Sequence, residues 1–254
     1  MNKNRFNLGI VLIMAIQVMN TEMTLSPMPF HMHENKSSFC EAHRICFIEG
    51  ESRGKIGYMA GERFLELVNQ VNFSESLWIN INALLCEPRR RHKCHWIFGE
   101  NQPPHFRLPK DVFGEMPFSL LARVSVYTNS KKIEKTDTEA KQHAFICDYR
   151  PMNRSGNITR LELFHSKSNL LRRMQALPDR TAGCFHYEHN VSLTWCAFRC
   201  HRDHACRSFY YNRISLACIH TKYVDSAMAN RDRIRNKSHW IRFSRPKWSS
   251  AGEL

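Results

Sequence analysis

The sequence has little that would hold it in a membrane, because it contains only one long apolar run. That run, residues 8–16, follows Lys3 and Arg5 and ends before the polar Gln17. A membrane-spanning helix needs roughly 20 apolar residues, whereas a charged segment followed by a short apolar one is typical of a secretory signal. We therefore expect residues 1–22 to be a signal peptide that is removed, and the protein to be secreted, extracellular and without a transmembrane anchor.

Recognisable catalytic motifs are also missing. The chain contains no Gly-x-Ser-x-Gly, no His-Glu-x-x-His, no P-loop and no paired-carboxylate pattern. Hydrolases, zinc proteases and phosphoryl-transfer enzymes place their reactive groups in such local arrangements. The sequence therefore predicts a non-enzymatic protein that uses no cofactor.

Metal-ligand spacing is scarce as well. No Cys-x-x-Cys pair occurs, and His31 and His33 resemble only half of a metal site, since no cysteine or acidic residue accompanies them at ligand spacing. We expect these two histidines to lie on an ordinary surface strand, and we predict no metal site.

Positive charge, in contrast, is abundant. The chain has 37 Lys and Arg against 23 Asp and Glu, a formal net charge of +14, and residues 158–254 alone hold 17 basic and 7 acidic residues. A basic extracellular surface attracts sulfated or sialylated glycans and anionic membranes. Nucleic acid is not expected as a partner, because the predicted compartment lacks it.

Ten cysteines are divided equally, five before Tyr149 and five after Gly183. Cysteine-rich chains of this kind belong to oxidising, extracellular compartments, where they form disulfides. The length, about one and a half typical domains, and the gap in the cysteine spacing predict two modest units.

A secreted chain also exposes its glycosylation sequons, which begin here at Asn35, Asn72, Asn153, Asn157, Asn190 and Asn236.

The first half is predicted to contain two helices followed by strands. Ser38 and Glu41 form a capping-box pattern at a helix start, and a second helix over residues 62–68 would place Phe64, Leu65 and Val68 on one face. Apolar and β-branched residues predict strands, and these cover residues 77–81, 122–126 and 143–147.

Residues 28–149 resemble a C-type lectin-like domain. Phe39, Ala42 and Cys46 stand as in the aromatic-x-x-Ala-x-x-x-Cys helix of that family, residues 78–81 (Trp-Ile-Asn-Ile) resemble its Trp-Ile-Gly-Leu strand, and residues 145–148 (Phe-Ile-Cys-Asp) resemble its terminal Phe-Ile-Cys-Glu. The resemblance implies a bridge from Cys46 to Cys147. Closing so long a loop stabilises a fold by about 4 to 5 kcal/mol in the chain-entropy model.

The first half also departs from this family. The second family bridge would need cysteines near Leu121 and Glu139, and neither is present. The nearest counterparts of the calcium and sugar triplets are residues 102–104 (Gln-Pro-Pro) and 133–137, and Pro104 removes a side-chain ligand from a cation that needs six to eight oxygens. We therefore expect no calcium-dependent sugar site.

A basic loop is the candidate binding element of this half. Cys86 and Cys94 enclose it and are predicted to bridge it locally, and it presents Arg89, Arg90, Arg91, His92 and Lys93. Clustered guanidinium groups match the geometry of sulfate and carboxylate. The loop is either an anion- or glycan-binding element or a solvated charged loop that its bridge stiffens.

The second half is predicted to pair one helix with two strands. Ser192 begins the helix, and Cys196 and Cys200 lie one turn apart on the same face, so both reach one neighbouring element. That element is formed by predicted strands over residues 206–212 and 217–220.

Residues 158–243 resemble a PAN/apple domain. The Cys-x-x-x-Cys helix, the Cys-x-Ser-Phe-x-Tyr-Asn strand and the final cysteine of that family stand here as Cys196, Cys200, Cys206, Ser208, Phe209, Tyr211, Asn212 and Cys218. The resemblance implies bridges from Cys196 to Cys218 and from Cys200 to Cys206. The family often has a further bridge between its first and last strands, which Cys184 would open, but no cysteine follows Cys218.

The sequence thus predicts an α+β protein of two small disulfide-stapled domains, with residues 150–157 as linker and residues 244–254 as a basic tail. The last strand is expected over residues 239–243. The basic stretch before and after that strand either binds polyanions or is a solvated end, and it includes Arg231, Arg233, Arg235 and Lys237.

Cys40 and Cys184 remain after these assignments, and they either join the two domains or link two chains into a dimer. The favoured function is that of a secreted, invertebrate-type recognition protein that binds glycans or glycoproteins, preferably anionic ones, without calcium. The alternative is an extracellular matrix or adhesion protein that uses both domains to contact other proteins.

Overall fold

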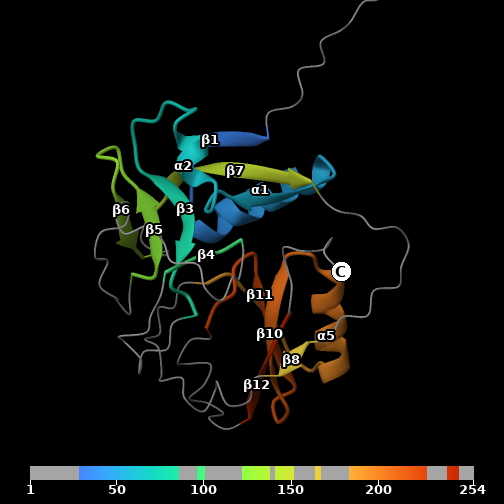
Figure 1. Ribbon diagram of the computed structural model, residues 1–254. Helices are drawn as coiled ribbons and strands as arrows, with labels where there is room; N and C mark the ends of the chain where they lie inside the picture. Colours follow the sequence, from blue (N-terminus) through green and yellow to red (C-terminus); the bar gives the residue numbers. More distant parts are fainter. Residues whose placement is uncertain are drawn as a thin grey trace, which may run out of the picture.

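The computed structural model describes residues 29–85, 96–100, 122–137, 141–151, 164–166, 183–227 and 239–245 of the chain. These residues form a mixed α+β, disulfide-rich fold built on two sheets (Figure 1). The predicted signal peptide, the 86–94 loop and the 102–104 triplet lie outside the described residues.

The first sheet belongs to the first half of the chain. Its seven strands are β1 (Phe30–Ser37), β2 (Lys55–Met59), β3 (Leu77–Asn82), β4 (Ile97–Phe98), β5 (Val124–Tyr127), β6 (Ile133–Thr136) and β7 (His143–Pro151). The main path runs β1-β7-β3-β5-β6, with β2 also pairing β7 and β4 pairing β3. The parallel β3–β7 pair and the long antiparallel β1–β7 pair make β7 the central strand. The three predicted strands are present, and β7 continues through Arg150 and Pro151, where the linker was expected to begin.

Helix α1 (Phe39–Ser52) begins as the sequence predicts. The Ser38 side chain accepts a hydrogen bond from the Glu41 backbone N–H at 3.3 Å. The Glu41 carboxylate does not complete the capping box, because it accepts hydrogen bonds from the Arg44 side chain, with 2.8 Å to Nε. One half of the predicted box is therefore enough to start the helix.

Helix α2 (Phe64–Val68) is shorter than predicted, and its buried face differs from the expected one. Phe64, Leu67 and Val68 are buried, whereas the Leu65 side chain is 40% exposed. The prediction that Leu65 shares the buried face is therefore wrong. In a helix of little more than one turn, the contact with the sheet decides which side chains are covered.

Apolar clusters cover both faces of the first sheet. One contains Leu77, Ile79 and Ile81 of β3, and the other contains Trp78 of the same strand. This division follows from the alternation of side chains along a strand. Trp78 is fully buried, and its indole N–H donates to the Ser37 carbonyl at 2.7 Å, so its one polar group is satisfied.

The second sheet belongs to the second half. It has the order β8-β12-β10-β11-β9, with antiparallel neighbours throughout. Its strands are β8 (His165–Ser166), β9 (Phe185–Glu188), β10 (Cys206–Asn212), β11 (Ala217–Lys222) and β12 (Trp240–Ser244). Helix α5 (Leu193–Arg202) flanks this sheet, and Ser192 caps it by accepting from the Trp195 N–H at 3.1 Å (Figure 1). The expected helix and all three expected strands of this half are present.

The end of β12 belongs to the fold, although residues 244–254 were expected to form a basic tail. Ser244 pairs with Ser208 of β10, and the following Arg245 is buried. The Arg245 guanidinium donates to the carbonyls of Cys200 and Cys206, at 2.6 and 2.9 Å. Because the last carbonyls of a helix have no partner within it, this arginine completes the C-terminal end of α5.

Four disulfides are present among the described residues. Cys46–Cys147, Cys196–Cys218 and Cys200–Cys206 are the pairs that the two resemblances imply. The fourth, Cys40–Cys184, joins the two halves within one chain. These two cysteines are therefore not available to link a second chain. No helix among the described residues has the length and the apolar character that crossing a membrane requires.

The two halves share a packed boundary beneath α1. Val224, which follows β11, lies in the same apolar cluster as Trp78 and Cys184. Arg207 of β10 is buried and donates to the Gly99 carbonyl of the first half at 3.0 Å. The boundary thus combines apolar contact, a buried hydrogen bond and a covalent link.

Candidate functional site

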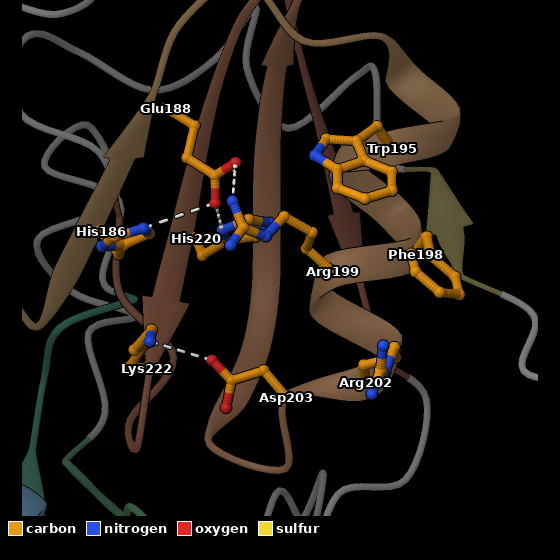
Figure 2. A pocket seen from close by; sticks show the side chains of 9 residues that line it. All are labelled: His186, Glu188, Trp195, Phe198, Arg199, Arg202, Asp203, His220 and Lys222. Carbon is orange, nitrogen blue, oxygen red and sulfur yellow. Dashed lines mark hydrogen bonds and ion pairs between the residues drawn. The ribbon is translucent and has the colours of Figure 1, made fainter.

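A pocket of about 400 Å³ lies between α5 and the strands β9 and β11 of the second half. Figure 2 shows its two walls, with the α5 side chains on one side and those of the strands on the other. It is open to solvent, and both walls carry charged groups.

The helix wall is built from two aromatic and two basic side chains. Trp195 lies three residues before Phe198 and four before Arg199, and Arg202 lies four residues after Phe198 and three after Arg199, which places all of them on one face of α5. Cys196 and Cys200 lie on the opposite, buried face and are tied to the sheet by their disulfides. The two bridges therefore orient the helix so that its aromatic and basic face is turned outward.

The two aromatic rings of this wall remain accessible. The Trp195 and Phe198 rings have centroids 5.6 Å apart and are 48% and 43% exposed. The Arg199 guanidinium lies 5.9 Å from the Trp195 ring centroid, and that of Arg202 lies 5.7 Å from the Phe198 ring centroid. Each ring thus carries a cation beside it, an arrangement that orders both partners.

The strand wall adds two carboxylate–cation contacts. The Glu188 carboxylate accepts a hydrogen bond from Arg199 at 2.9 Å, and Lys222 pairs with Asp203 at 2.9 Å. These contacts link the two walls of the pocket and neutralise much of its charge. Among the described ion pairs Arg202 has no acidic partner, so the pocket keeps a positive excess at that end.

His220 lies at the floor of the pocket, between β11 and α5. Burial lowers the pKa of its imidazole, and the opposing attraction of the Cys196 carbonyl and Glu188 is smaller. Its Nε2–H donates to the Cys196 carbonyl at 3.0 Å. This hydrogen bond ties β11 to helix α5 beneath the pocket.

The predicted binding residues lie elsewhere. The basic loop with Arg89, Arg90, Arg91, His92 and Lys93, its bridge from Cys86 to Cys94, and the basic residues Arg231, Arg233, Arg235 and Lys237 are outside the described residues. Residues 133–136 of the second lectin-triplet candidate form β6, which pairs with β5.

Three of the six sequons can be located. Asn35, Asn72 and Asn190 are all exposed, whereas Asn153, Asn157 and Asn236 lie outside the described residues. The backbone of Asn190 has a φ of 57°, in the left-handed region that asparagine tolerates better than most residues. Their glycosylation stays a prediction.

The pocket was not predicted from the sequence, although the sequence contains one signal for it. The prediction for residues 192–200 used only the cysteine face of the helix, and the same helical spacing also aligns Trp195, Phe198 and Arg202 on the other face. The strand residues were not predictable in this way. Glu188 and His220 meet because of the β9–β11 register, in which Cys218 faces Glu188.

Among the residues that the structure describes, two groups of side chains have metal-ligand chemistry. Cys196, Cys218 and His220 form one, but both of its sulfurs are engaged in a disulfide. The other comprises His31, His33 and Glu49. The sequence indicates no acidic partner for the two histidines at ligand spacing, and the fold supplies one from α1.

The chain was compared with known proteins at the levels of family, sequence and structure. No protein-family model and no curated protein sequence matches it. Among solved structures, the carbohydrate-recognition domain of the mouse scavenger receptor C-type lectin is similar, with 14% sequence identity and a TM-score of 0.33. The match covers 48% of this chain and 90% of that one. A likeness this distant does not assign the chain to a family.

Proposed function

We propose that the protein is a secreted, non-enzymatic recognition protein that binds anionic glycans without calcium, and that the pocket beside α5 is its binding site. The observation that carries this proposal is the pairing of exposed aromatic rings with arginines around an open pocket. We also propose that the chain consists of a C-type lectin-like unit followed by a PAN/apple-like unit. The bridges Cys46–Cys147 and Cys196–Cys218 support this division, because the two resemblances imply them.

The chemistry of the rim suits a sulfated or carboxylated sugar. A sugar ring has an apolar face that packs against an indole or phenyl ring, as Trp195 and Phe198 present here. A guanidinium donates two parallel hydrogen bonds to a sulfate or carboxylate, and Arg202 stands beside the Phe198 ring for that contact. The net charge of +14 raises the local concentration of polyanions around the molecule.

A glycan array probed with the purified chain tests this function. We expect binding to sulfated or sialylated glycans that weakens as salt rises, because surface charges are screened, and that is equal with calcium or with EDTA. Trp195→Ala should weaken it about 3- to 10-fold, as expected for one aromatic contact, and Arg202→Gln about 10-fold or more, as for a charge-assisted hydrogen bond.

Matched controls come from the β10–β11 turn on the same half. Arg213 and Ile214 are exposed there, Ile214 by 62%, and Arg213→Gln and Ile214→Ala should leave binding unchanged. Absence of binding to every glycan, or equal loss in the turn variants, would contradict the proposal. Loss of binding in EDTA would contradict its calcium independence.

An adhesion role is the second candidate, and the same exposed aromatic pair favours it. Tryptophan, phenylalanine and arginine are enriched at protein–protein interfaces, and Trp195, Phe198 and Arg202 form one continuous face. Capture of extracellular proteins before and after enzymatic removal of their glycans distinguishes the two roles. A partner retained without its glycans, and released by Trp195→Ala, supports adhesion over glycan recognition.

A further inference from the structure

Two histidines and a glutamate converge on the first half, far from the α5 pocket along the chain. His31 and His33 lie on β1, and Glu49 lies in the last turn of α1. His33 Nε2 is 3.2 Å from Glu49 Oε1, and His31 Nδ1 is 3.5 Å from Glu49 Oε2. One ligand atom from each residue lies within 4.8 Å of the other two.

The fold fixes the elements that bring these groups together. Residues two apart on a strand point to the same face, so both imidazoles leave β1 on one side while Met32 packs into the apolar cluster on the other. The β1–β7 register places His31 opposite Cys147, and the Cys46–Cys147 bridge fastens α1 to that same point of β7. A covalent bond therefore holds the helix that carries Glu49 against the strands.

Neighbouring side chains also orient the three groups. The His33 ring stacks on Phe145 with centroids 4.6 Å apart and planes 13° from parallel. The Tyr149 hydroxyl donates a hydrogen bond to Glu49 Oε2. Outer partners of this kind fix ligand orientation in metal sites, and removing them commonly weakens metal affinity 10- to 100-fold.

We propose that His31, His33 and Glu49 form a binding site for a borderline transition-metal ion, with Zn²⁺ as the ion of choice. Two imidazoles and one carboxylate, with a fourth position left to water, are a donor set that zinc accepts. Zinc–ligand distances of about 2.0 to 2.2 Å in a tetrahedron place neighbouring ligand atoms about 3.3 Å apart. A single carboxylate oxygen meets that spacing, because Glu49 Oε2 lies 3.3 Å from His33 Nε2 and 3.5 Å from His31 Nδ1.

Calcium is the wrong ion for this site. It takes six to eight oxygen ligands, and the group offers a single carboxylate beside two nitrogen donors. The site is thus chemically distinct from the calcium site of C-type lectins. It also uses other residues than 102–104 and 133–137, which are the nearest counterparts of the calcium triplets in the sequence.

One neighbour opposes a cation. An Arg53 guanidinium nitrogen lies 3.8 Å from Glu49 Oε2, and the guanidinium carbon lies 4.2 Å from the centroid of the Tyr149 ring. Arg53 competes with a metal ion for the carboxylate and repels it. We therefore expect that removing the positive charge of Arg53 increases the affinity of the site for a metal ion.

The test is calorimetric titration of the EDTA-stripped, dialysed full chain with zinc chloride, repeated with calcium chloride. Zinc affinity should fall at least about 10-fold in His31→Gln and His33→Gln, since losing a ligand costs no less than losing an outer partner. Arg53→Gln should bind zinc more tightly than the wild type. His189→Gln is the matched control, an exposed histidine of the second half, and should leave the affinity unchanged.

The outcomes separate a metal site from a mere ion-pair cluster that fastens β1 to α1. The proposal would be overturned if the wild type and His33→Gln bound zinc with equal affinity, or if Arg53→Gln bound zinc more weakly than the wild type. It would also be overturned if the protein bound calcium at a site from which zinc displaces it. Circular dichroism confirms that each variant is folded. The Arg53→Gln variant distinguishes the metal site from a loss of folding, because a destabilised protein would not bind zinc more tightly.

Discussion

His43 is a buried histidine at the boundary of the two halves, and it makes the stability of the fold depend on pH. Its imidazole is buried on α1, edge-on to the Phe39 ring at 4.7 Å and parallel to the Tyr223 ring at 6.2 Å. Burial, with a smaller contribution from the positive charge of Arg207, lowers the pKa of His43 to about 3 from its ordinary 6.5. The folded protein thus keeps this histidine neutral where an unfolded chain would protonate it.

The stability of the fold should therefore decrease in mild acid. A histidine with a depressed folded pKa contributes stability that is fully present above pH 6.5 and is lost as the pH falls toward 3. Between pH 7 and pH 5 this linkage amounts to about 2 kcal/mol for His43 alone. We expect the urea-derived free energy of unfolding, measured without reductant, to fall by about that much more in the wild type than in His43→Phe.

The control for this prediction is His189→Gln, which changes an exposed histidine and should preserve the pH dependence of the wild type. Equal losses of stability between pH 7 and pH 5 in the wild type and His43→Phe would show that His43 does not carry the effect.

Residue pairs were predictable to the extent that a local pattern encodes them. The bridges Cys196–Cys218 and Cys200–Cys206 belong to a short motif that the sequence displays, and the resemblance implied them. The contact between His33 and Glu49 spans 16 residues and two elements. No spacing rule reaches that far, so the acidic partner of the histidines was missed.

At the scale of elements, the close contact between α1 and β2 depends on two glycines. A Cβ at Gly57 of β2 would overlap the carbonyl oxygen of Cys46, and a Cβ at Gly50 of α1 would overlap the backbone nitrogen of Gly57. The helix thus packs directly against the strand backbone. This contact sets the position of α1, and with it the positions of Cys46 and Glu49.

Adding one methyl group at this contact should destabilise the first half. Overpacking typically costs about 1–3 kcal/mol, and more where the backbone cannot move, so we expect Gly57→Ala to lower the free energy of unfolding by at least about 2 kcal/mol. Glu51→Ala, at an exposed position of α1, should change it by less than about 0.5 kcal/mol. Chemical denaturation of both variants checks this, and equal stability of the two would refute the packing argument.

Elements were predicted best where the local signal was strong and where burial agreed with it. The capping serines 38 and 192 marked the starts of α1 and α5 correctly, and the run at residues 77–81 marked β3. Strand β9 and the exposed side of α5 were missed because their role arises from register and packing between elements. The pocket consequently had no counterpart in the sequence predictions, which assigned binding to the loop of residues 89–93.

At the scale of the whole molecule, Cys40–Cys184 answers the question that the odd cysteine count in each half raised. Its Cα atoms are 5.4 Å apart although 144 residues separate them in sequence, which is within the usual range for a disulfide. Sequence alone left two partners open, the other half or a second chain, because the proximity depends on how the halves pack. The structure selects the bond within the chain.

This bond should hold the two halves together after the backbone is cut between them. With a specific protease site placed in residues 152–163, between β7 and β8, the cleaved protein should migrate as one band on denaturing electrophoresis without reductant and as two bands with it. Cys40 and Cys184 are the only described residues that form a covalent bridge between the halves. Changing both to serine should therefore give two bands even without reductant.

A uniform monomer-sized band is also expected for the uncut wild type without reductant, since neither cysteine is left for a second chain. Two bands from the cut wild type without reductant, or a dimer that the double serine variant abolishes, would contradict the bond within the chain.

The uncut double variant provides the stability comparison. Removing a native bridge commonly costs about 2–5 kcal/mol, and here that loss should fall on the boundary where Val224 packs against the first half, so that the uncut double variant unfolds at lower urea concentrations than the uncut wild type.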